Sequence, residues 1–441
     1  MMKTPIFSFA EEYKNSSPVR MHMPGHKGKG DSSEAYDITE IEGADSLYEA
    51  SGIIKESERC AGEIFGTDAY FSAEGSSLAI RAMIYLISLH AASLGKRCKI
   101  LAGRNAHKTF ISSVALIGAD VEWIFGDGSY LECKISADSV RRLIEKEKPT
   151  AVYLTSPDYL GNIADIFAIS EVCHSTGTLL AVDNAHGAYL NFLDDNRHPI
   201  SLGADICCDS AHKTLHALTG AAYLHVSHSA PKIFSENAKD AMALFGSTSP
   251  SYLILASLDK LNAALCDGYR EKLSKAVGMI NSLKTDLSEH GYTLIGNEPM
   301  KITISSKPYG YTGIELSSYL FSHGIVSEFS DPDYLVLMPS ADTSEDDIKR
   351  VRDALLSLGK REKITDAPIT ITPPQKALSI REATLGMRET VQISDAIGRI
   401  LAISSVGCPP AVPLIVSGEI INESIVRAFE YYGIKTCKVI K

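Results

Sequence analysis

Residues 181–190 read AVDNAHGAYL, and residues 205–215 read DICCDSAHKTL. Each segment contains a run of apolar residues typical of a buried strand and then continues into polar residues. The first predicts a strand that ends in Asp183, and the second predicts a neighbouring strand that ends in Ser210, His212 and Lys213. We therefore expect an acid and a lysine at the ends of two adjacent strands.

An acid and a lysine in this arrangement suit the chemistry of pyridoxal 5′-phosphate (PLP). The amine of Lys213 can hold the aldehyde of PLP as a Schiff base, and the carboxylate of Asp183 can keep the pyridine nitrogen protonated. The protonated ring accepts electrons, so bonds at the α-carbon of an amino acid can be broken. The plainer interpretation of Asp183 is a helix cap, but a carboxylate buried without a partner is unfavourable, and a pyridinium would be that partner.

A phosphate site is predicted where a loop enters the long helical segment 76–95. Gly75, Ser76 and Ser77 lie at this entry point. Backbone N–H groups at the start of a helix, together with two hydroxyls, favour an anion. A serine after a glycine turn is also a common helix cap. The interpretation as a phosphate site is therefore supported only by the lysine and the acid further along the chain.

Two further segments offer ligands with an equally plain alternative. His107 follows the predicted strand 98–103, where a flat imidazole can stack on a pyridine ring or simply cap a helix. The STSPSY segment supplies Thr248 and Ser249, whose hydroxyls can serve a phosphate or form an ordinary turn.

The order of the predicted elements indicates an α/β protein. Short apolar segments typical of buried strands occur at 98–103, 120–126, 150–156, 178–183 and 204–210. Helical segments occur around and between them at 55–66, 76–95, 136–149 and 165–177. Near-continuous apolar strands that alternate with helices favour a mostly parallel sheet covered on both faces.

The composition changes along the chain, and this predicts a division into parts. We expect an N-terminal arm with active-site loops (1–55), a large PLP-binding domain (56–262), a small α+β domain (263–360), a linker with paired prolines (361–375) and a C-terminal domain (376–441).

Charge and cysteine content narrow the class of protein. The chain has 43 Lys and Arg residues against 54 Asp and Glu residues, which disfavours nucleic acid or an anionic membrane as a partner. No apolar run approaches the roughly 20 residues of a membrane helix, and the first residues lack the layout of a signal peptide. The nine cysteines are scattered without a CxxC pair, so we expect no disulfide framework, no metal site and a reducing cytoplasm.

Several segments occur in the order seen in the Orn/Lys/Arg decarboxylase family, which the chain resembles over nearly its whole length. They are MPGHKG, SAEGSS, RNAHKT, TSPDYLGNIADI, VDNAHGAYL, GADICCDSAHKTLHALTG, STSPSY and CPPAVPLIVSGE. The chain looks like the short, Gram-positive-type members, which lack an N-terminal wing domain. The resemblance implies a fold-type I large domain of the aspartate aminotransferase kind, a smaller α+β domain and a C-terminal α+β domain.

The resemblance also implies roles for individual residues. Lys213 would bind the cofactor covalently, Asp183 would pair with the pyridine nitrogen, Ala185 would lie under the ring and His107 would stack on its other face. The cofactor-binding set would be Gly75, Ser76, Ser77, His107, Asp183, Ala185, His186, Ser210, His212, Lys213, Thr248 and Ser249. The active site would lie at the interface of a homodimer, with Thr248 or Ser249 reaching the partner subunit's phosphate.

The expected activity is decarboxylation of a basic amino acid, arginine first and then lysine or ornithine, to the corresponding amine (agmatine, cadaverine or putrescine) in polyamine metabolism. The expected catalytic set is Lys213, His107, His212 and Asp183. Either Lys213 or His212 would protonate the α-carbon. Glu419 and Asp45 are candidates for the substrate's distal end, and Glu328 is a third acidic candidate. The alternatives are a PLP aminotransferase, a lyase, or a non-catalytic PLP-binding regulatory paralogue.

Four positions depart from the family pattern. Glu74 precedes the phosphate loop where an asparagine is common, and Asn184 follows the acid where short members often carry glutamate. Cys408 and Ala411 stand where a tyrosine and a glycine are usual. None of the four is the lysine, the acid or the stacking histidine, so these departures bear on substrate specificity.

Overall fold

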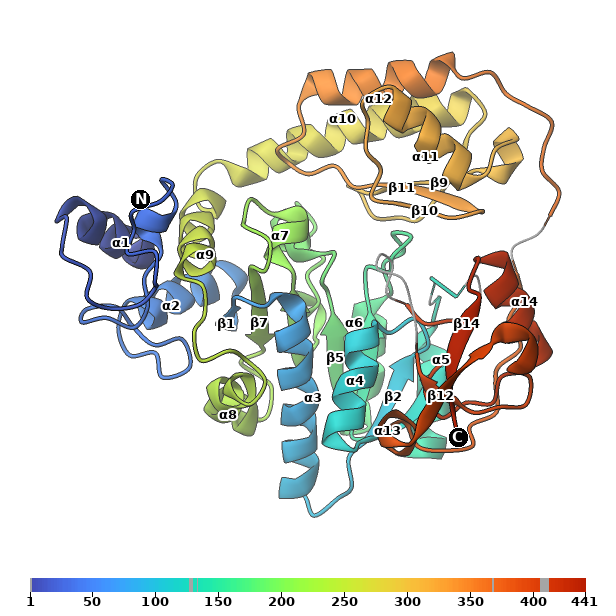
Figure 1. Ribbon diagram of the computed structural model, residues 1–441, viewed down its shortest axis with the longest axis horizontal. Coiled ribbons are helices and arrows are strands. Elements are labelled where there is room, and N and C mark those ends of the chain that lie inside the picture. The colour runs from blue at the N-terminus through green and yellow to red at the C-terminus, as the bar shows by residue number, and fades with distance from the viewer. Residues whose placement is uncertain (1, 127–129, 133, 367–368, 405–411) are drawn as a thin grey trace. The chain divides into compact units, whose positions relative to one another are not determined.

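The computed structural model (Figure 1) describes residues 2–126, 130–132, 134–366, 369–404 and 412–441. Its strands form three sheets, and the fold is α/β with a mostly parallel central sheet, as predicted. The sheet orders are β1-β7-β6-β5-β4-β2-β3, β10-β11-β9-β8 and β12-β14-β13.

The chain divides into two compact units, which are described separately below. Unit 1 comprises Met1–Cys98, Thr150–Tyr153 and Ile166–Leu273. Unit 2 comprises Lys99–Pro149, Leu154–Asp165 and Ser274–Lys441. Strand β4 (Ala151–Thr155) and helix α10 (Tyr269–Glu289) each contribute residues to both units.

Unit 1 contains the two segments 181–190 and 205–215. Its strands are β1 (Asp68–Ser72), β5 (Leu179–Asp183), β6 (Ile206–Asp209) and β7 (Ala222–Val226). Strands β5 and β6 are parallel, whereas β7 is antiparallel to both β6 and β1. All residues of β5, β6 and β7 are buried, which explains their near-continuous apolar sequence. Its helices include α1 (Pro5–Asn15), α2 (Ile53–Phe65), α3 (Gly75–Ser93), α6 (Ile166–Ser175), α8 (Lys232–Ala243) and α9 (Tyr252–Leu265).

Helix α3 corrects one expectation about membranes. Among the described residues, it is the one helix long and apolar enough, by length and composition, to cross a membrane. Arg81 and His90 interrupt its apolar run, which hid this property in the sequence. Half of the window is buried inside the protein, and α3 contacts β1, β6, β7 and α8, as the core helix of a folded domain does.

Unit 2 contains the remaining sheets. Strands β2 (Lys99–Gly103) and β3 (Asp120–Ile124) are parallel. The antiparallel four-stranded sheet contains β8 (Thr293–Ile295), β9 (Ile302–Ser305), β10 (Phe329–Ser330) and β11 (Tyr334–Leu337), and the three-stranded sheet contains β12 (Arg388–Gln392), β13 (Leu401–Ile403) and β14 (Thr436–Ile440). Its helices include α4 (Lys108–Ile117), α5 (Ala137–Glu147), α11 (Gly313–Ser322), α12 (Glu345–Ser357), α13 (Ile380–Leu385) and α14 (Glu423–Tyr431).

The structure differs from the sequence prediction in two places within unit 1. Strand β6 ends at Asp209, and Ser210 is the N-cap of the one-turn helix α7 (Ala211–Thr214), so Lys213 lies on this helix instead of the strand. Strands β1 and β7 were missed, because their sequences, DAYFS and AYLHV, mix polar with apolar residues. The five-part domain division proposed from composition stays a prediction.

Candidate active site

The two segments singled out in the sequence meet in unit 1. Lys213 lies on α7, directly after β6, and His186 lies in the loop after β5. The Nζ atom of Lys213 is 3.0 Å from Nε2 of His186. Because β5 and β6 are adjacent and parallel, their carboxyl ends bring these side chains to the same edge of the sheet.

Asp183 is the last residue of β5 and is only 2% exposed. Its carboxylate accepts hydrogen bonds from the Tyr153 hydroxyl (3.3 Å), the Ala185 backbone N–H (3.2 Å) and the Cys208 thiol (3.6 Å). In the described part of the chain, every donor to Asp183 is therefore neutral. A buried carboxylate with neutral donors fits a protonated pyridine nitrogen, which would balance its charge.

The start of α3 fits a phosphate group. Gly75 has a φ of +68°, and its N–H donates to the Gly220 carbonyl at 2.7 Å. A Cβ atom at position 75 would lie 3.9 Å from Cε1 of His212, so the start of α3 and the lysine-bearing segment are neighbours. Ser76 and Ser77, both half-buried, form the first turn of this helix. The Oγ atom of Ser210 is buried without a hydrogen-bond partner, so a ligand with phosphate oxygens would satisfy it.

His212 is held by a backbone carbonyl. Its Nδ1–H donates to the carbonyl of Ala221 at 2.9 Å, which assigns the proton of the neutral ring to Nδ1. Burial lowers the pKa of His212, and the charge of Lys213 lowers it further against the opposing effect of the Ala221 carbonyl. His212 is therefore neutral at pH 7, with Nε2 as a hydrogen-bond acceptor.

The loop with Thr248 and Ser249 is tied to the residue before the phosphate loop. The Ser247 N–H donates to Oε1 of Glu74 at 2.6 Å, and the Ser249 N–H donates to Oγ of Ser247 at 3.1 Å. Thr248 and Ser249 are both exposed. Glu74, which stands where the family commonly has an asparagine, therefore holds this loop through its side chain within unit 1.

His107 belongs to unit 2, where it caps a helix. It is the N-cap of α4, and its Nδ1 atom accepts the Thr109 N–H at 3.1 Å and lies 2.9 Å from the Thr109 hydroxyl. The alternative offered by the sequence, a helix-capping histidine, is therefore confirmed. Capping also fixes the orientation of the ring, but stacking on a cofactor stays a prediction.

Asp45 and Glu419, the two carboxylates named for the substrate, are buried and have protein partners. Asp45 accepts backbone N–H groups from Ser46, Ser51, Gly52, Ile54 and Lys55. Burial would raise the pKa of Asp45, but these hydrogen bonds together outweigh it and lower that pKa. The Asp45 carboxylate thus holds the start of α2, and a substrate could bind it only by displacing these contacts.

Glu419 forms a buried ion pair in unit 2. Its Oε2 atom is 3.1 Å from Nη2 of Arg104 and accepts the Val416 N–H at 2.7 Å. Burial raises the pKa of Glu419, and Arg104 partly offsets this effect. Arg104 also donates to the Pro413 and Leu414 carbonyls. The charge of Glu419 is therefore already paired within the protein, and its place at the substrate's distal end stays a prediction. Cys408 and Ala411 lie outside the described residues.

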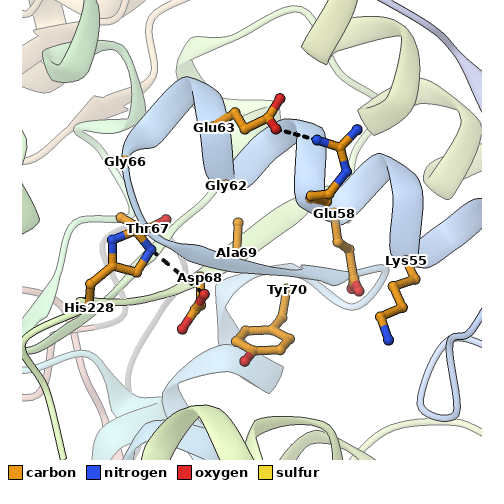
Figure 2. A pocket seen from close by; sticks show the side chains of 11 residues that line it. Lys55, Glu58, Gly62, Glu63, Gly66, Thr67, Asp68, Ala69, Tyr70 and His228 are labelled. Carbon is orange, nitrogen blue, oxygen red and sulfur yellow. Dashed lines mark hydrogen bonds and ion pairs between the residues drawn. The ribbon is translucent and has the colours of Figure 1, made fainter. Parts of the chain in front are cut away.

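A separate pocket of about 390 Å³ opens between α2 and β1 in unit 1 (Figure 2). It is lined by Lys55, Glu58, Arg59, Gly62, Glu63, Gly66, Thr67, Asp68, Ala69, Tyr70 and His228. Four of its titratable side chains form two pairs, Arg59 with Glu63 and Asp68 with His228. None of the predicted site residues lines this pocket, so it is distinct from the Lys213 site.

Tyr153 was not predicted from the sequence as a partner of Asp183. Tyr153 lies in β4 and is fully buried. A tyrosine within an aliphatic strand is a usable signal, because a buried hydroxyl needs a hydrogen-bond partner. The contact between His186 and Lys213 left no such signal, since it depends on how two loops approach each other.

Comparison with known proteins assigns the chain to a family. Residues 4–295 match the major domain of the Orn/Lys/Arg decarboxylases, and residues 360–436 match their C-terminal domain. The chain belongs to the Orn/Lys/Arg decarboxylase family. Members of this family are PLP-dependent, and this enzyme is accordingly a PLP-dependent decarboxylase that acts on a basic amino acid.

Individual relatives agree with this assignment. The arginine decarboxylase of Bacillus subtilis is 28% identical, with 96% of this chain and 92% of that protein aligned. The arginine decarboxylase of Halalkalibacterium halodurans is 29% identical, with the same coverage of both chains. The solved structure of lysine decarboxylase A from Pseudomonas aeruginosa has a TM-score of 0.81 at 19% identity, covers 99% of this chain and 80% of its own, and shares the fold.

Proposed function

We propose that the substrate of this decarboxylase is L-arginine and that its products are agmatine and CO₂. The observation that carries the chemistry is the buried Asp183, with neutral donors only, on the strand beside the segment that bears Lys213. Arginine is favoured because relatives named arginine decarboxylase align with this chain over 96% of its length, whereas the P. aeruginosa lysine decarboxylase LdcA aligns with 59% of it.

Asp183 would hold a positive charge at the pyridine nitrogen. PLP, when bound, supplies an electron sink for the pair of electrons left by departing CO₂. Asp183 can hold that positive charge because its carboxylate is only 2% exposed and is oriented by the Tyr153 hydroxyl and the Ala185 N–H. Loss of a bond to the α-carbon then becomes favourable without a strong base.

Lys213 would supply the proton that replaces the departing CO₂ on the α-carbon. Its Nζ atom can donate to Nε2 of His186, 3.0 Å away, so His186 can orient the ammonium group. His212 is less suited to this step, because its proton is on Nδ1 and is donated to the Ala221 carbonyl. Ser210, whose buried Oγ atom has no hydrogen-bond partner, would instead bind the phosphate group with the first turn of α3.

Glu328 is the proposed acceptor for the guanidinium group. It is exposed, and its Oε1 atom accepts the neutral Tyr159 hydroxyl at 3.0 Å. A carboxylate with a neutral neighbour can still form a bidentate pair with a guanidinium. Replacing Glu328 with Gln should raise the KM for arginine about tenfold and change kcat much less. Asp45→Asn serves as the control, and it should leave this KM unchanged.

We also propose a homodimer, a cytoplasmic location and a role in polyamine metabolism. The exposed Thr248 and Ser249 are available to a partner subunit's phosphate site. No disulfide joins the seven described cysteines, six of which are buried, and this fits a reducing compartment. Sedimentation at several protein concentrations tests the dimer. Replacing both Thr248 and Ser249 with alanine should weaken PLP binding without dissociating the dimer.

The deciding experiment measures CO₂ release by the PLP-loaded enzyme with arginine, lysine, ornithine and other amino acids. Release from arginine with agmatine as product would support the proposal, and a higher kcat/KM for lysine or ornithine would overturn it. A protein that binds PLP through Lys213 but releases no CO₂ from any basic amino acid would point to a transaminase, another lyase or a regulatory protein.

A further inference from the structure

Four polar side chains form a fully buried cluster in unit 1 that the chemistry above does not use. They are Asn184, His198, Asp209 and His225, each 0% exposed. Asp209 is at the centre. Its Oδ1 atom accepts Nδ2 of Asn184 at 2.6 Å, and its Oδ2 atom lies 3.1 Å from Nε2 of His198 and 3.3 Å from Nε2 of His225.

The cluster joins the two segments that carry the active site. Asn184 lies between Asp183 and Ala185, and Asp209 ends β6 directly before Ser210. The Asn184 N–H also donates to the Cys208 carbonyl at 3.0 Å, which continues the β5–β6 pairing beyond the end of β5. The side-chain contact between Asn184 and Asp209 therefore fixes the loop after β5 against the start of α7.

The histidines explain how Asp209 remains charged in this position. Burial favours its neutral form, but His198 and then His225 outweigh burial and hold the pKa of Asp209 well below its usual range. On the other side of its ring, Nδ1 of His225 lies 3.0 Å from the Thr67 hydroxyl. The Cys207 thiol, whose pKa burial raises, is 3.9 Å from Nε2 of His198. Asp209 thus has imidazole partners of its own, whereas Asp183 has none among the described residues.

We propose that Asp209, held by His198 and His225, is a positioning residue that acts through Asn184 to set the Asp183–Ala185 loop for the cofactor ring. This inference rests on the proposed roles of Asp183 and Lys213. It also explains the departure at Asn184. An amide can donate to the Asp209 carboxylate, whereas a glutamate at this position would bring two carboxylates together.

Asp205 provides a matched control at the opposite end of β6. It is 5% exposed, accepts the Leu180 N–H of β5 at 2.7 Å and faces Nε2 of His174 at 3.3 Å. Both aspartates are thus buried, contact a histidine and link β6 to the β5 segment. They differ in that Asp209 contacts the residue next to Asp183, whereas Asp205 contacts the other end of β5.

The test measures the Kd for PLP and the visible circular dichroism of bound PLP in full-length Asp209→Asn, Asn184→Ala and Asp205→Asn. Loss of a hydrogen bond to a charged group predicts a Kd for PLP raised about tenfold in the first two variants, with altered circular dichroism. Asp205→Asn should lose thermal stability yet keep the wild-type Kd. Asn184→Ala leaves the Asp209–histidine contacts intact, so it remains informative if Asp209→Asn does not fold.

Three outcomes would overturn the positioning role. The first is a wild-type Kd and circular dichroism in the Asp209 and Asn184 variants. The second is an equal loss of PLP affinity in Asp205→Asn. The third is stoichiometric zinc in the purified enzyme that is lost on Asp209→Asn, which would make the cluster a metal site. If the wild-type enzyme binds PLP but decarboxylates no basic amino acid, the proposed function fails while this test still stands. If the wild-type enzyme decarboxylates a basic amino acid but the Asp209 and Asn184 variants bind PLP normally, only the positioning role is rejected.

Discussion

Asp183 in unit 1 and Glu419 in unit 2 are both almost completely buried acids, at 2% and 3% exposure, but their partners differ. Glu419 has a cation of its own, the guanidinium of Arg104. Asp183 has the neutral donors Tyr153, Ala185 and Cys208. The Glu419 pair is internally balanced, as a structural ion pair is, whereas the charge of Asp183 is left for a ligand. Under the proposed function, charge balance therefore separates Asp183 from Glu419 better than burial does.

The largest expected effect comes from removing Lys213, which follows the strand adjacent to the one that ends in Asp183. Lys213→Ala should lower decarboxylation by at least about 10⁴-fold, because the covalent attachment and the proposed proton donor are lost together. Turnover and the absorbance of bound PLP measure this change. Lys232→Ala, an exposed lysine at the start of α8, should retain wild-type activity. Near-full activity of Lys213→Ala with PLP bound would reject the assignment of the site.

Removing the charge of Asp183 should come next in size. Asp183→Asn should reduce kcat by about 10³-fold, because no carboxylate then stabilises a positive charge at the pyridine nitrogen. Its stability without PLP should be unchanged or higher, since an unbalanced buried charge is removed. Steady-state kinetics and urea unfolding of the cofactor-free protein measure the two effects. The exposed Asp194→Asn is the control, and a stable Asp183→Asn enzyme with normal kcat would contradict the comparison.

Replacing Glu419 should reduce stability, whereas replacing Asp183 should reduce kcat. Glu419→Gln should lower the free energy of unfolding by about 3 kcal/mol, because it leaves the buried guanidinium of Arg104 without a counter-charge. The double variant Arg104→Met with Glu419→Leu should recover most of this loss. Urea unfolding gives both values. A Glu419→Gln enzyme of normal stability but with a greatly raised KM for arginine would return Glu419 to the substrate site.

Asp259 sharpens the comparison, because it is a buried acid with neutral donors but no lysine-bearing active-site segment beside it. It accepts the Phe7 N–H at 2.9 Å and the Ser57 hydroxyl at 2.5 Å. Burial raises the pKa of Asp259 to about 6, from 3.8. Neutral donors alone therefore do not identify a functional acid, since such a group can also respond by holding its proton.

The raised pKa of Asp259 predicts the smallest effect, a pH dependence of stability. Between pH 3.8 and about pH 6, the carboxyl group of Asp259 has lost its proton in the unfolded chain but keeps it in the folded protein. The associated stability is therefore fully present below about pH 4 and is lost as the pH rises through 6, by at most about 3 kcal/mol. Urea unfolding at pH 4 to 7 measures this decline. Asp259→Asn should flatten it, and an unchanged pH profile in that variant would show that Asp259 titrates normally.

Much of the fold was predictable because it depends on local patterns. The apolar segments ending in Asp183 and Asp209 became β5 and β6, since buried parallel strands need continuous apolar residues. The short strands β1 and β7 were not predictable in this way, because their formation depends on pairing with each other and, for β7, with β6. Helix α7 was also missed, because its single turn is too short for a periodic pattern.

The chemistry of the site was predictable from residue type, since few roles suit a lysine and an acid at the ends of adjacent apolar strands. Which carboxylates are neutralised was not predictable. Glu419 and Asp45 were equally good substrate candidates in the sequence, and only their contacts with Arg104 and with the backbone of residues 46–55 gave them structural roles. Sequence determined the kinds of groups present and their order along the strands. Tertiary structure decided which charges are balanced, because electrostatic pairing depends on distances of a few ångströms between segments far apart in the chain.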